Sequence, residues 1–298
     1  MSGESRPATL AELATSRLAL GLIAFARSTT WRRSLAVGER LGDLAHALRI
    51  RRAVAERNLA LAFPEKGAGD RAAILRDHYR ELGRVCVEYA RLAELAMSPP
   101  GEVLESLRGM EHVEAALAKG RGVVFVTGHV CNFELAGGWV ARAWPLDFVY
   151  KRLTNPAMES WISARRRELG VGLIEIGAGV RAVFAALRAN RCVAMLADQD
   201  ARRHGVFVPF FGRLASTAVG PAAIALRSGA PLIPTFDRRL ADGRHRVEIH
   251  PPLVIDDPGA PDAEGRLTAL HTARLEERIR ESPADWFWLH RRWKTPPP

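Results

Sequence analysis

Hydrophobic and polar residues follow two different patterns along this chain, and the change falls near residue 100. Before it, long stretches rich in Ala, Leu and Arg contain few helix breakers, so residues 10–98 are predicted to be mainly helical. Pro99, Pro100 and Gly101 end this section. After it, short β-branched runs alternate with helical stretches, beginning with the apolar run GVVFVT at residues 122–127.

The alternation continues to the end of the chain and indicates an α/β fold. Further strands are predicted at residues 147–150, 172–176, 192–197, 232–237 and 246–250, and helices at 132–142, 156–169, 180–189, 218–228 and 268–279. This order is typical of a mostly parallel central sheet flanked by helices. We therefore expect an N-terminal helical section, residues 1–100, packed on an α/β core, residues 101–298, the two together forming one domain.

Composition adds a basic charge and argues for a reducing compartment. The 298 residues carry a formal net charge of +10, which suits an acidic partner such as nucleic acid, an anionic membrane or an acidic carrier protein. The simpler alternative is that Arg serves as the solubilising charge. The three cysteines are widely spaced and form no CxxC pair, so neither a disulfide framework nor a zinc site is indicated.

One apolar run, LALGLIAFA at residues 18–26, bears on membrane attachment. It falls far short of the ~20 residues that span a bilayer. Glu4 and Glu12 stand where a signal peptide would carry positive charge, so we predict neither export nor a transmembrane helix. A helix lying in the membrane interface and a helix packed on the core are equally compatible with the pattern.

The segment TGHVCNFE, residues 127–134, is the first candidate for chemistry because it follows a predicted buried strand. Its glycine permits a tight turn and its asparagine suits a helix N-cap, which places His129 on the turn and Glu134 in the first helical turn. A hydrogen bond from His129 to Glu134 would leave the other ring nitrogen free to take a proton from a hydroxyl. A chance pair is the alternative. Cys131 is a weaker candidate nucleophile, since its place in the turn gives poor geometry towards His129.

A second polar cluster, ADQD at residues 197–200, also follows an apolar strand. Asp198 and Asp200 could bind a metal, fill an N-cap or turn role, or hold a cationic side chain. We favour the cation, because basic residues are plentiful at 151–152 and 165–167. An arginine held there could stabilise the oxyanion formed when a thioester carbonyl is attacked.

Two aromatic segments complete the candidates. GVFVPFFG at residues 205–212 could line a groove for an acyl chain through Phe210 and Phe211, although a β-segment packed in the core fits the periodicity as well. DWFWLHRRWK at residues 285–294 mixes aromatic and basic side chains. It could stack nucleic-acid bases or lie at a lipid headgroup surface.

Taken together, these segments resemble the lysophospholipid acyltransferase superfamily, and in particular its bacterial branch of lipid A late acyltransferases, which acylate Kdo-lipid IVA. His129, four residues and Glu134 reproduce the superfamily signature. The resemblance runs from about residue 50 to the end, through residues 51–65 (RRAVAERNLALAFPE), 80–91 (RELGRVCVEYAR), 149–156 (VYKRLTNP), 198–212 (DQDARRHGVFVPFFG) and 286–296 (WFWLHRRWKTP).

The resemblance implies an O-acyltransferase that moves a fatty acyl group from an acyl carrier protein thioester to a glycolipid hydroxyl. It implies a peripheral or shallowly anchored protein at the cytoplasmic face of the bacterial inner membrane. His129 would be the general base and Glu134 its partner, Arg166 would position the acyl carbonyl or phosphates, and Asp198 would complete the polar site. No metal and no cofactor are implied.

Four further residues are expected to contact substrate: Lys151, Asp200, Phe210 and Phe211. Lys151 stands where many members of the family have Arg, so a point charge replaces a bidentate donor. The expected partners are acyl carrier protein, anionic membrane lipid and the glycolipid acceptor, without nucleic acid. Coenzyme A as donor, another lipid acceptor (an inositol-mannoside, ornithine lipid or lysolipid) and a basic binding protein without catalysis are the alternatives.

Overall fold

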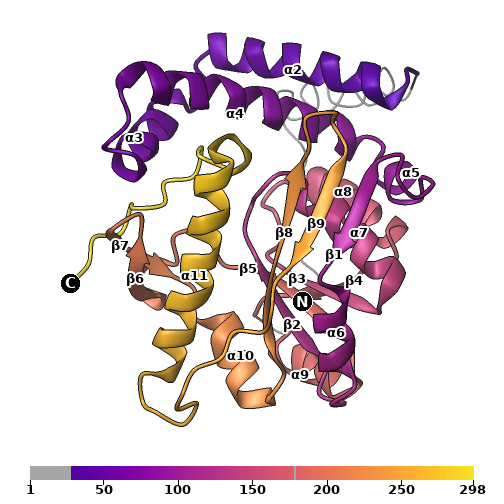
Figure 1. Cartoon of the computed structure of the whole chain (residues 1–298), viewed down its shortest axis with the longest axis vertical. Helices are drawn as coiled ribbons and strands as arrows, with labels where there is room; N and C mark the ends of the chain where they lie inside the picture. Colours follow the sequence, from indigo (N-terminus) through magenta and orange to yellow (C-terminus); the bar gives the residue numbers. More distant parts are fainter. Residues whose placement is uncertain (1–27, 178) are drawn as a thin grey trace.

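A computed structural model describes residues 28–177 and 179–298, and a central sheet lies between two layers of helices (Figure 1). Within these residues the sheet has the strand order β1-β9-β8-β2-β5-β3-β4. The strands are β1 (Leu104–Arg108), β2 (Val123–Thr127), β3 (Leu146–Tyr150), β4 (Gly172–Glu175), β5 (Cys192–Leu196), β8 (Leu232–Arg239) and β9 (His245–Ile249). All neighbours pair in parallel except β8 and β9. The predicted fold class is confirmed.

Helices cover both faces of the sheet, which explains why its central strands are apolar throughout. One face carries α5 (Leu92–Ala96), α6 (Met110–Leu117), α7 (Phe133–Ala143) and α8 (Pro156–Glu168), and the other α9 (Val180–Arg188), α10 (Gly220–Ser228) and α11 (Ala263–Glu281). In β2, Phe125 packs in the α7 layer, whereas Val124 and Val126 pack with α9 and α10. Burial on both faces stabilises the whole run GVVFVT.

The strand register brings two loops together at the carboxyl edge of the sheet. Thr127, the last residue of β2, pairs with Leu196, the last residue of β5. The loops that follow, residues 128–132 and 197–201, therefore begin side by side. In parallel α/β sheets this edge is where ligands bind.

The N-terminal section comprises α2 (Trp31–Ala47), α3 (Arg52–Ala62) and α4 (Ala68–Tyr89), and α2 packs along α4 (Figure 1). Glycine makes the close approach of these two helices possible. A Cβ at Gly83 would lie 1.9 Å from the backbone oxygen of Gly38, and one at Gly42 would lie 2.1 Å from that of Tyr79. The helical prediction is confirmed for the described residues, while the run at residues 18–26 lies outside them.

A buried ion network joins α4 to the sheet. Arg239 of β8 donates to Glu81 at 2.9 Å and to Glu88 at 2.7 Å, both on α4. His245 of β9 lies between Glu88 (Nε2 to Oε1, 3.0 Å) and Asp237 (Nδ1 to Oδ2, 2.8 Å). Because unpaired charges are costly inside a protein, these contacts fix the helical section on the core.

Phe210 and Phe211 are core residues, so the prediction that they line an acyl groove is wrong. They belong to the hairpin of β6 (Val206–Phe210) and β7 (Arg213–Thr217), which packs on α11. Phe210 lies edge-on to Trp286 (centroids 5.5 Å apart) and Phe211 edge-on to Phe63 (5.2 Å). The two side chains are 0 % and 5 % exposed, and the alternative of a packed β-segment is confirmed.

Strands β1 and β7 and helix α6 were not predicted. The residues of β1 (LESLR) are only partly buried, so their hydrophobic pattern is weak, and α6 is eight residues long.

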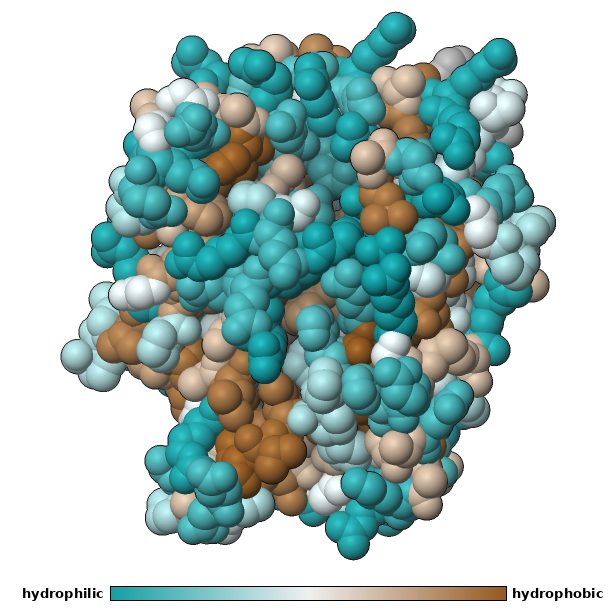
Figure 2. All heavy atoms as spheres, viewed as in Figure 1, coloured by the Kyte–Doolittle hydropathy of each residue, from teal (hydrophilic) through white to brown (hydrophobic). Residues whose placement is uncertain are grey.

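The face seen in Figure 2 is mostly hydrophilic, with hydrophobic patches such as the one where α10 and α11 lie in Figure 1. Among the described residues, none of the helices combines the length and the apolar character that crossing a bilayer requires.

Candidate active site

The loop between β2 and α7 carries His129. Strand β2 is buried up to Thr127, and α7 begins after Asn132, whose side chain accepts a hydrogen bond from the Leu135 N–H at 3.1 Å. Asn132 is itself held by the ion network, since its N–H donates to Asp237 at 3.0 Å. His129 lies between these two fixed points with 29 % of its side chain exposed.

Asp198, on the loop after β5, is the hydrogen-bond partner of His129. Nδ1 of His129 lies 2.7 Å from Oδ1 of Asp198, and the backbone N–H of His129 donates to Oδ2 at 2.8 Å. The Trp286 indole N–H also donates to Oδ2, at 2.9 Å. An ionised carboxylate accepts, so in the neutral imidazole Nδ1 carries the proton and Nε2 keeps a lone pair. Nε2 lies 3.4 Å from the side-chain nitrogen of Gln199.

Charge at this pair favours a protonated imidazole beside an ionised carboxylate. Burial lowers the pKa of His129, but attraction to Asp198 and the hydrogen bond with it outweigh burial, and the pKa is raised. Burial raises the pKa of Asp198, but attraction to His129 and the hydrogen bonds that Asp198 accepts lower it to about 2. The pair is therefore suited to hold a proton that His129 takes from a substrate.

Glu134 does not hydrogen-bond His129, so that part of the prediction is wrong. Its fully buried carboxylate accepts from Arg166, with Nε 3.0 Å from both oxygens and a second guanidinium nitrogen in contact with Oε1. The two carboxylates thus exchange the partners expected from the sequence: Asp198 holds the imidazole and Glu134 holds the arginine. Glu134 still acts on His129 at a distance, because its charge helps raise the pKa of His129.

Arg166 is held in a fixed orientation at the side of the site. Its guanidinium lies over the rings of Tyr150 (5.4 Å) and Phe148 (5.9 Å), and only 14 % of its side chain is exposed. Ring contacts and the bidentate ion pair together restrict its rotation. The cation is therefore positioned before any ligand arrives.

A cavity of about 550 Å³ lies between α7 and the sheet, and His129, Arg166, Gln199 and Lys151 line it. The rest of its wall is largely apolar, with side chains from both the strands and the helix, among them Phe125, Phe133, Ala136, Val140, Leu146, Phe148, Ala194 and Leu196. Its size and lining are those of a site for a small apolar ligand. The exposed Lys151 also lines the cavity, and its contact with substrate stays a prediction.

Asp200 lies outside this cavity, in a neighbouring depression. Oδ2 of Asp200 accepts from the Thr295 hydroxyl at 2.9 Å, and the Asp200 N–H donates to Nε2 of His290 at 3.1 Å. The depression also contains Lys151 and Gln199, which connect it to the cavity.

Cys131 is a protonated core thiol. Its Sγ donates to Glu81 at 3.3 Å, and burial together with the charges of Asp237 and Glu81 raises its pKa well above the usual value. A thiol in this state is a poor nucleophile. Both its protonation and its place in the turn therefore disfavour Cys131 as the nucleophile.

Cys131, Asp237 and His245 offer ligand atoms within 4.8 Å of one another, the spacing of a metal site. Each of them already has a partner in the ion network. Burial lowers the pKa of His245, but the charges of Asp237 and Glu88 raise it to about 9. His245 lies between Asp237 and Glu88, and Cys131 donates to Glu81, so these residues serve as part of the ion network.

The C-terminal segment, residues 285–295, supports the loop that carries His129, and sequence reasoning missed this role. The Cys131 N–H donates to the carbonyl oxygen of Asp285 at 2.8 Å, and the Phe287 N–H to that of His129 at 3.0 Å. Trp286, fully buried, orients Asp198. The aromatic density of DWFW was the available signal for burial, but its contact with the loop depends on tertiary structure.

Comparison with known proteins shows which family this sequence resembles. A family model described as bacterial lipid A biosynthesis acyltransferase matches residues 13–295. The chain belongs to this family. It is therefore an acyltransferase, and the resemblance found in its motifs is confirmed.

Individual relatives cover most of the chain. A lipid A biosynthesis palmitoleoyltransferase of Escherichia coli is 29% identical over 88% of this chain and 85% of its own length. A lipid A biosynthesis lauroyltransferase of the same species is 30% identical over 86% and 84%. A phosphatidylinositol mannoside acyltransferase of Mycobacterium tuberculosis is 34% identical over 62% and 58%.

Proposed function

We propose that this acyltransferase moves a fatty acyl group from an acyl carrier protein thioester to a hydroxyl of a glycolipid resembling Kdo-lipid IVA. One observation carries the proposal. His129 is held by Asp198 and lines an apolar cavity together with a fixed cation, Arg166. A base, a cation and an apolar channel are what transfer of an acyl chain requires.

The chemistry is a direct attack. Nε2 of His129 takes the proton of the acceptor hydroxyl while the hydroxyl oxygen bonds to the thioester carbonyl carbon. The C–S bond then breaks, and the proton passes from His129 to the leaving sulfur. Asp198 stays ionised throughout and stabilises the imidazolium, which agrees with its pKa of about 2. The reaction as proposed uses no cofactor and forms no acyl-enzyme.

Arg166 stabilises the oxyanion that forms on the carbonyl oxygen. Glu134 engages Nε and one Nη of its guanidinium, and a guanidinium has five N–H donors, so donors remain for a ligand. Since Glu134 orients Arg166 and the rings of Phe148 and Tyr150 support it, little reorganisation is needed when charge develops. Glu134 is thus a positioning residue for the arginine.

We place the reaction at the cytoplasmic face of the bacterial inner membrane, with the protein bound peripherally or anchored shallowly. The net charge of +10 supports attraction both to anionic lipid and to an acidic carrier protein. The partners follow from this proposal: acyl carrier protein as donor, and anionic lipid and the glycolipid acceptor at the surface.

His129→Ala provides the first test, assayed with radiolabelled acyl carrier protein and membranes. Loss of a general base lowers the rate about 10²–10⁴-fold. The purified variant should keep the wild-type circular dichroism and a cooperative unfolding transition, which shows that it is folded. Full transfer activity in this variant would refute the mechanism.

A phosphatidylinositol mannoside is a second candidate acceptor, because the 34% identical relative from Mycobacterium tuberculosis carries that name. Mass spectrometry of lipids from a strain lacking the gene separates the two. The proposal requires lipid A that has lost one acyl chain. Intact lipid A together with an under-acylated mannoside would instead identify the mannoside as the acceptor.

A further inference from the structure

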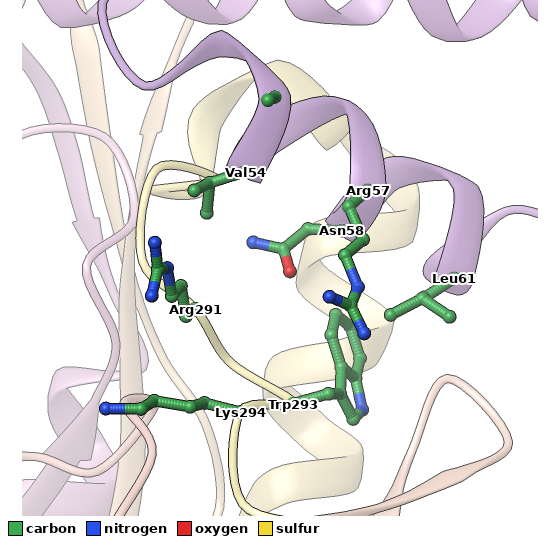
Figure 3. A pocket seen from close by; sticks show the side chains of 8 residues that line it. Val54, Arg57, Asn58, Leu61, Arg291, Trp293 and Lys294 are labelled. Atoms are coloured by element: carbon green, nitrogen blue, oxygen red, sulfur yellow. The ribbon is translucent and has the colours of Figure 1, made fainter.

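Two adjoining depressions beside the catalytic cavity are lined by cations, and we call them together the cationic groove. The larger, of about 850 Å³, includes Arg51, Lys151, Arg202, Arg291 and Lys294. The smaller, of about 470 Å³, lies between α3 and the C-terminal segment. Figure 3 shows Arg57 on one side of it and Arg291 and Lys294 on the other.

These cations lack carboxylate partners. Within the described residues, none of Arg51, Arg57, Arg202, Arg291 and Lys294 has a carboxylate oxygen within the 4.0 Å of a salt bridge, whereas several arginines elsewhere are paired, as Arg84 is with Glu39 at 2.8 Å. The carboxylate that lines the groove, Asp200, accepts a hydrogen bond from Thr295. Like charges gathered in one hollow repel each other, and a bound anion removes that cost.

The groove is held in shape from both sides. Asn58 of α3 donates to the carbonyl oxygens of Trp288 (2.8 Å) and His290 (2.6 Å). On the opposite side the Asp200 N–H donates to His290, as described above. A fixed segment presents its cations without an ordering cost at the moment of binding, which strengthens binding.

Two of the arginines that line the cationic groove have a strained backbone. Arg51 has φ 55° and Arg202 φ 56°, the left-handed region that non-glycine residues seldom adopt. Strain of this kind persists where the surrounding structure imposes it, and it is enriched at ligand sites. Both arginines line the larger depression.

We propose that the cationic groove binds a phosphate group on the headgroup of the lipid acceptor. Guanidinium groups match phosphate in a bidentate way, and the hollow admits a small anion, whereas the carboxylates of a carrier-protein helix would meet only its rim. Lys151 and Gln199 line both the groove and the catalytic cavity, so a lipid whose phosphate sits in the groove presents a nearby hydroxyl to His129. This inference rests on the proposed function.

Steady-state kinetics test the groove with two acceptors: a phosphorylated disaccharide lipid, and the same lipid after phosphatase treatment. Replacing Arg291 and Lys294 together by Ala should lower kcat/KM for the phosphorylated acceptor about ten- to a hundredfold. It should leave kcat/KM for the dephosphorylated acceptor and KM for acyl carrier protein unchanged. Equal losses with both acceptors, or a rise in KM for the carrier protein, would overturn the proposal.

Arg188→Ala is the matched control, because Arg188 is an exposed cation on α9 that lines neither depression. It removes the same kind of charge and should leave the preference for the phosphorylated acceptor intact. If Arg188→Ala also lost the preference for the phosphorylated acceptor, that preference would arise from the net charge of the protein, and this result would count against the groove.

Binding without turnover separates this proposal from the proposed function. His129→Ala protein should bind vesicles containing the phosphorylated lipid at least about tenfold more tightly than vesicles with the dephosphorylated lipid, and the added Arg291/Lys294 replacements should remove the difference. If the wild type transfers acyl groups to neither lipid, the proposed function fails while this binding difference still stands. Equal binding to both vesicles refutes the groove alone.

Discussion

Two buried carboxylates divide the work at the level of single residues. Asp198 holds His129 in one tautomer, and Glu134 holds Arg166. The first pair joins the loops that follow β5 and β2, and the second joins α7 to α8, so neither depends on spacing along the sequence. His129 and Arg166 can therefore be altered separately.

Asp198→Asn should lower kcat/KM about 10²–10⁴-fold, because the amide no longer stabilises the imidazolium. The acidic limb of the pH profile should also move to lower pH. His129 must be unprotonated to act, and loss of the Asp198 charge removes the attraction that raises its pKa. Initial rates from pH 5 to 9 measure both effects.

Asp200→Asn is the control for that shift, since Asp200 is also an acid of the ADQD segment but bonds to His290 and Thr295. Its profile should keep the wild-type acidic limb. An unshifted limb in Asp198→Asn would mean that another group controls the protonation state.

Glu134→Gln should lower the free energy of unfolding by about 3–5 kcal/mol, because it leaves the largely buried Arg166 without its counter-charge. A second replacement, Arg166→Met, should restore much of that stability without restoring activity. Urea unfolding and transfer assays on the two variants test this. Recovered activity in the double variant would exclude Arg166 from the chemistry.

Among the elements, the packing of α2 on α4 depends on glycine. Gly83→Ala should destabilise the protein by about 1–3 kcal/mol, since its methyl group would meet the backbone of Gly38. Gly69→Ala, in the same helix, meets nothing within 4 Å and should not destabilise. Thermal unfolding compares them, and equal melting temperatures would contradict this account of the packing.

The sequence predicted the elements better than their contacts. Strands such as β2 and β5 were recognisable because both faces are buried, and their apolar runs are continuous. The partner of His129 was not recognisable in the sequence, because the contact with Asp198 arises from the register of β2 beside β5. The location of Phe210 and Phe211 was ambiguous for a related reason, since the same apolar run can line a groove or pack in a core.

At the scale of the whole molecule, the ion network makes stability depend on pH. The folded pKa of His245, about 9, exceeds its ordinary value, so its protonation stabilises the fold. That stabilisation is complete below about pH 6.5, is lost as the pH rises through about 9, and is on the order of 3 kcal/mol. Glu88, Asp237, Arg239 and Cys131 surround this group.

Urea unfolding at pH 7, 8, 9 and 10 measures this loss. In His245→Asn the unfolding free energy should be lower at pH 7 and should change less with pH, because the titrating group is gone. A wild-type free energy that stays constant across the range would show that the network is not held by a charged His245.

The support that residues 285–295 give to the catalytic loop has a consequence for the timing of activity. Every side chain proposed to take part in the chemistry leaves the ribosome before Trp286, yet Asp198 and the His129 loop are completed by hydrogen bonds from that late segment. A nascent chain halted before residue 285 would contain His129, Asp198 and Arg166, but it would lack the hydrogen bonds that hold Asp198 and the His129 loop in place. Acyl transfer would thus be withheld until this segment has been synthesised and has folded against the loop.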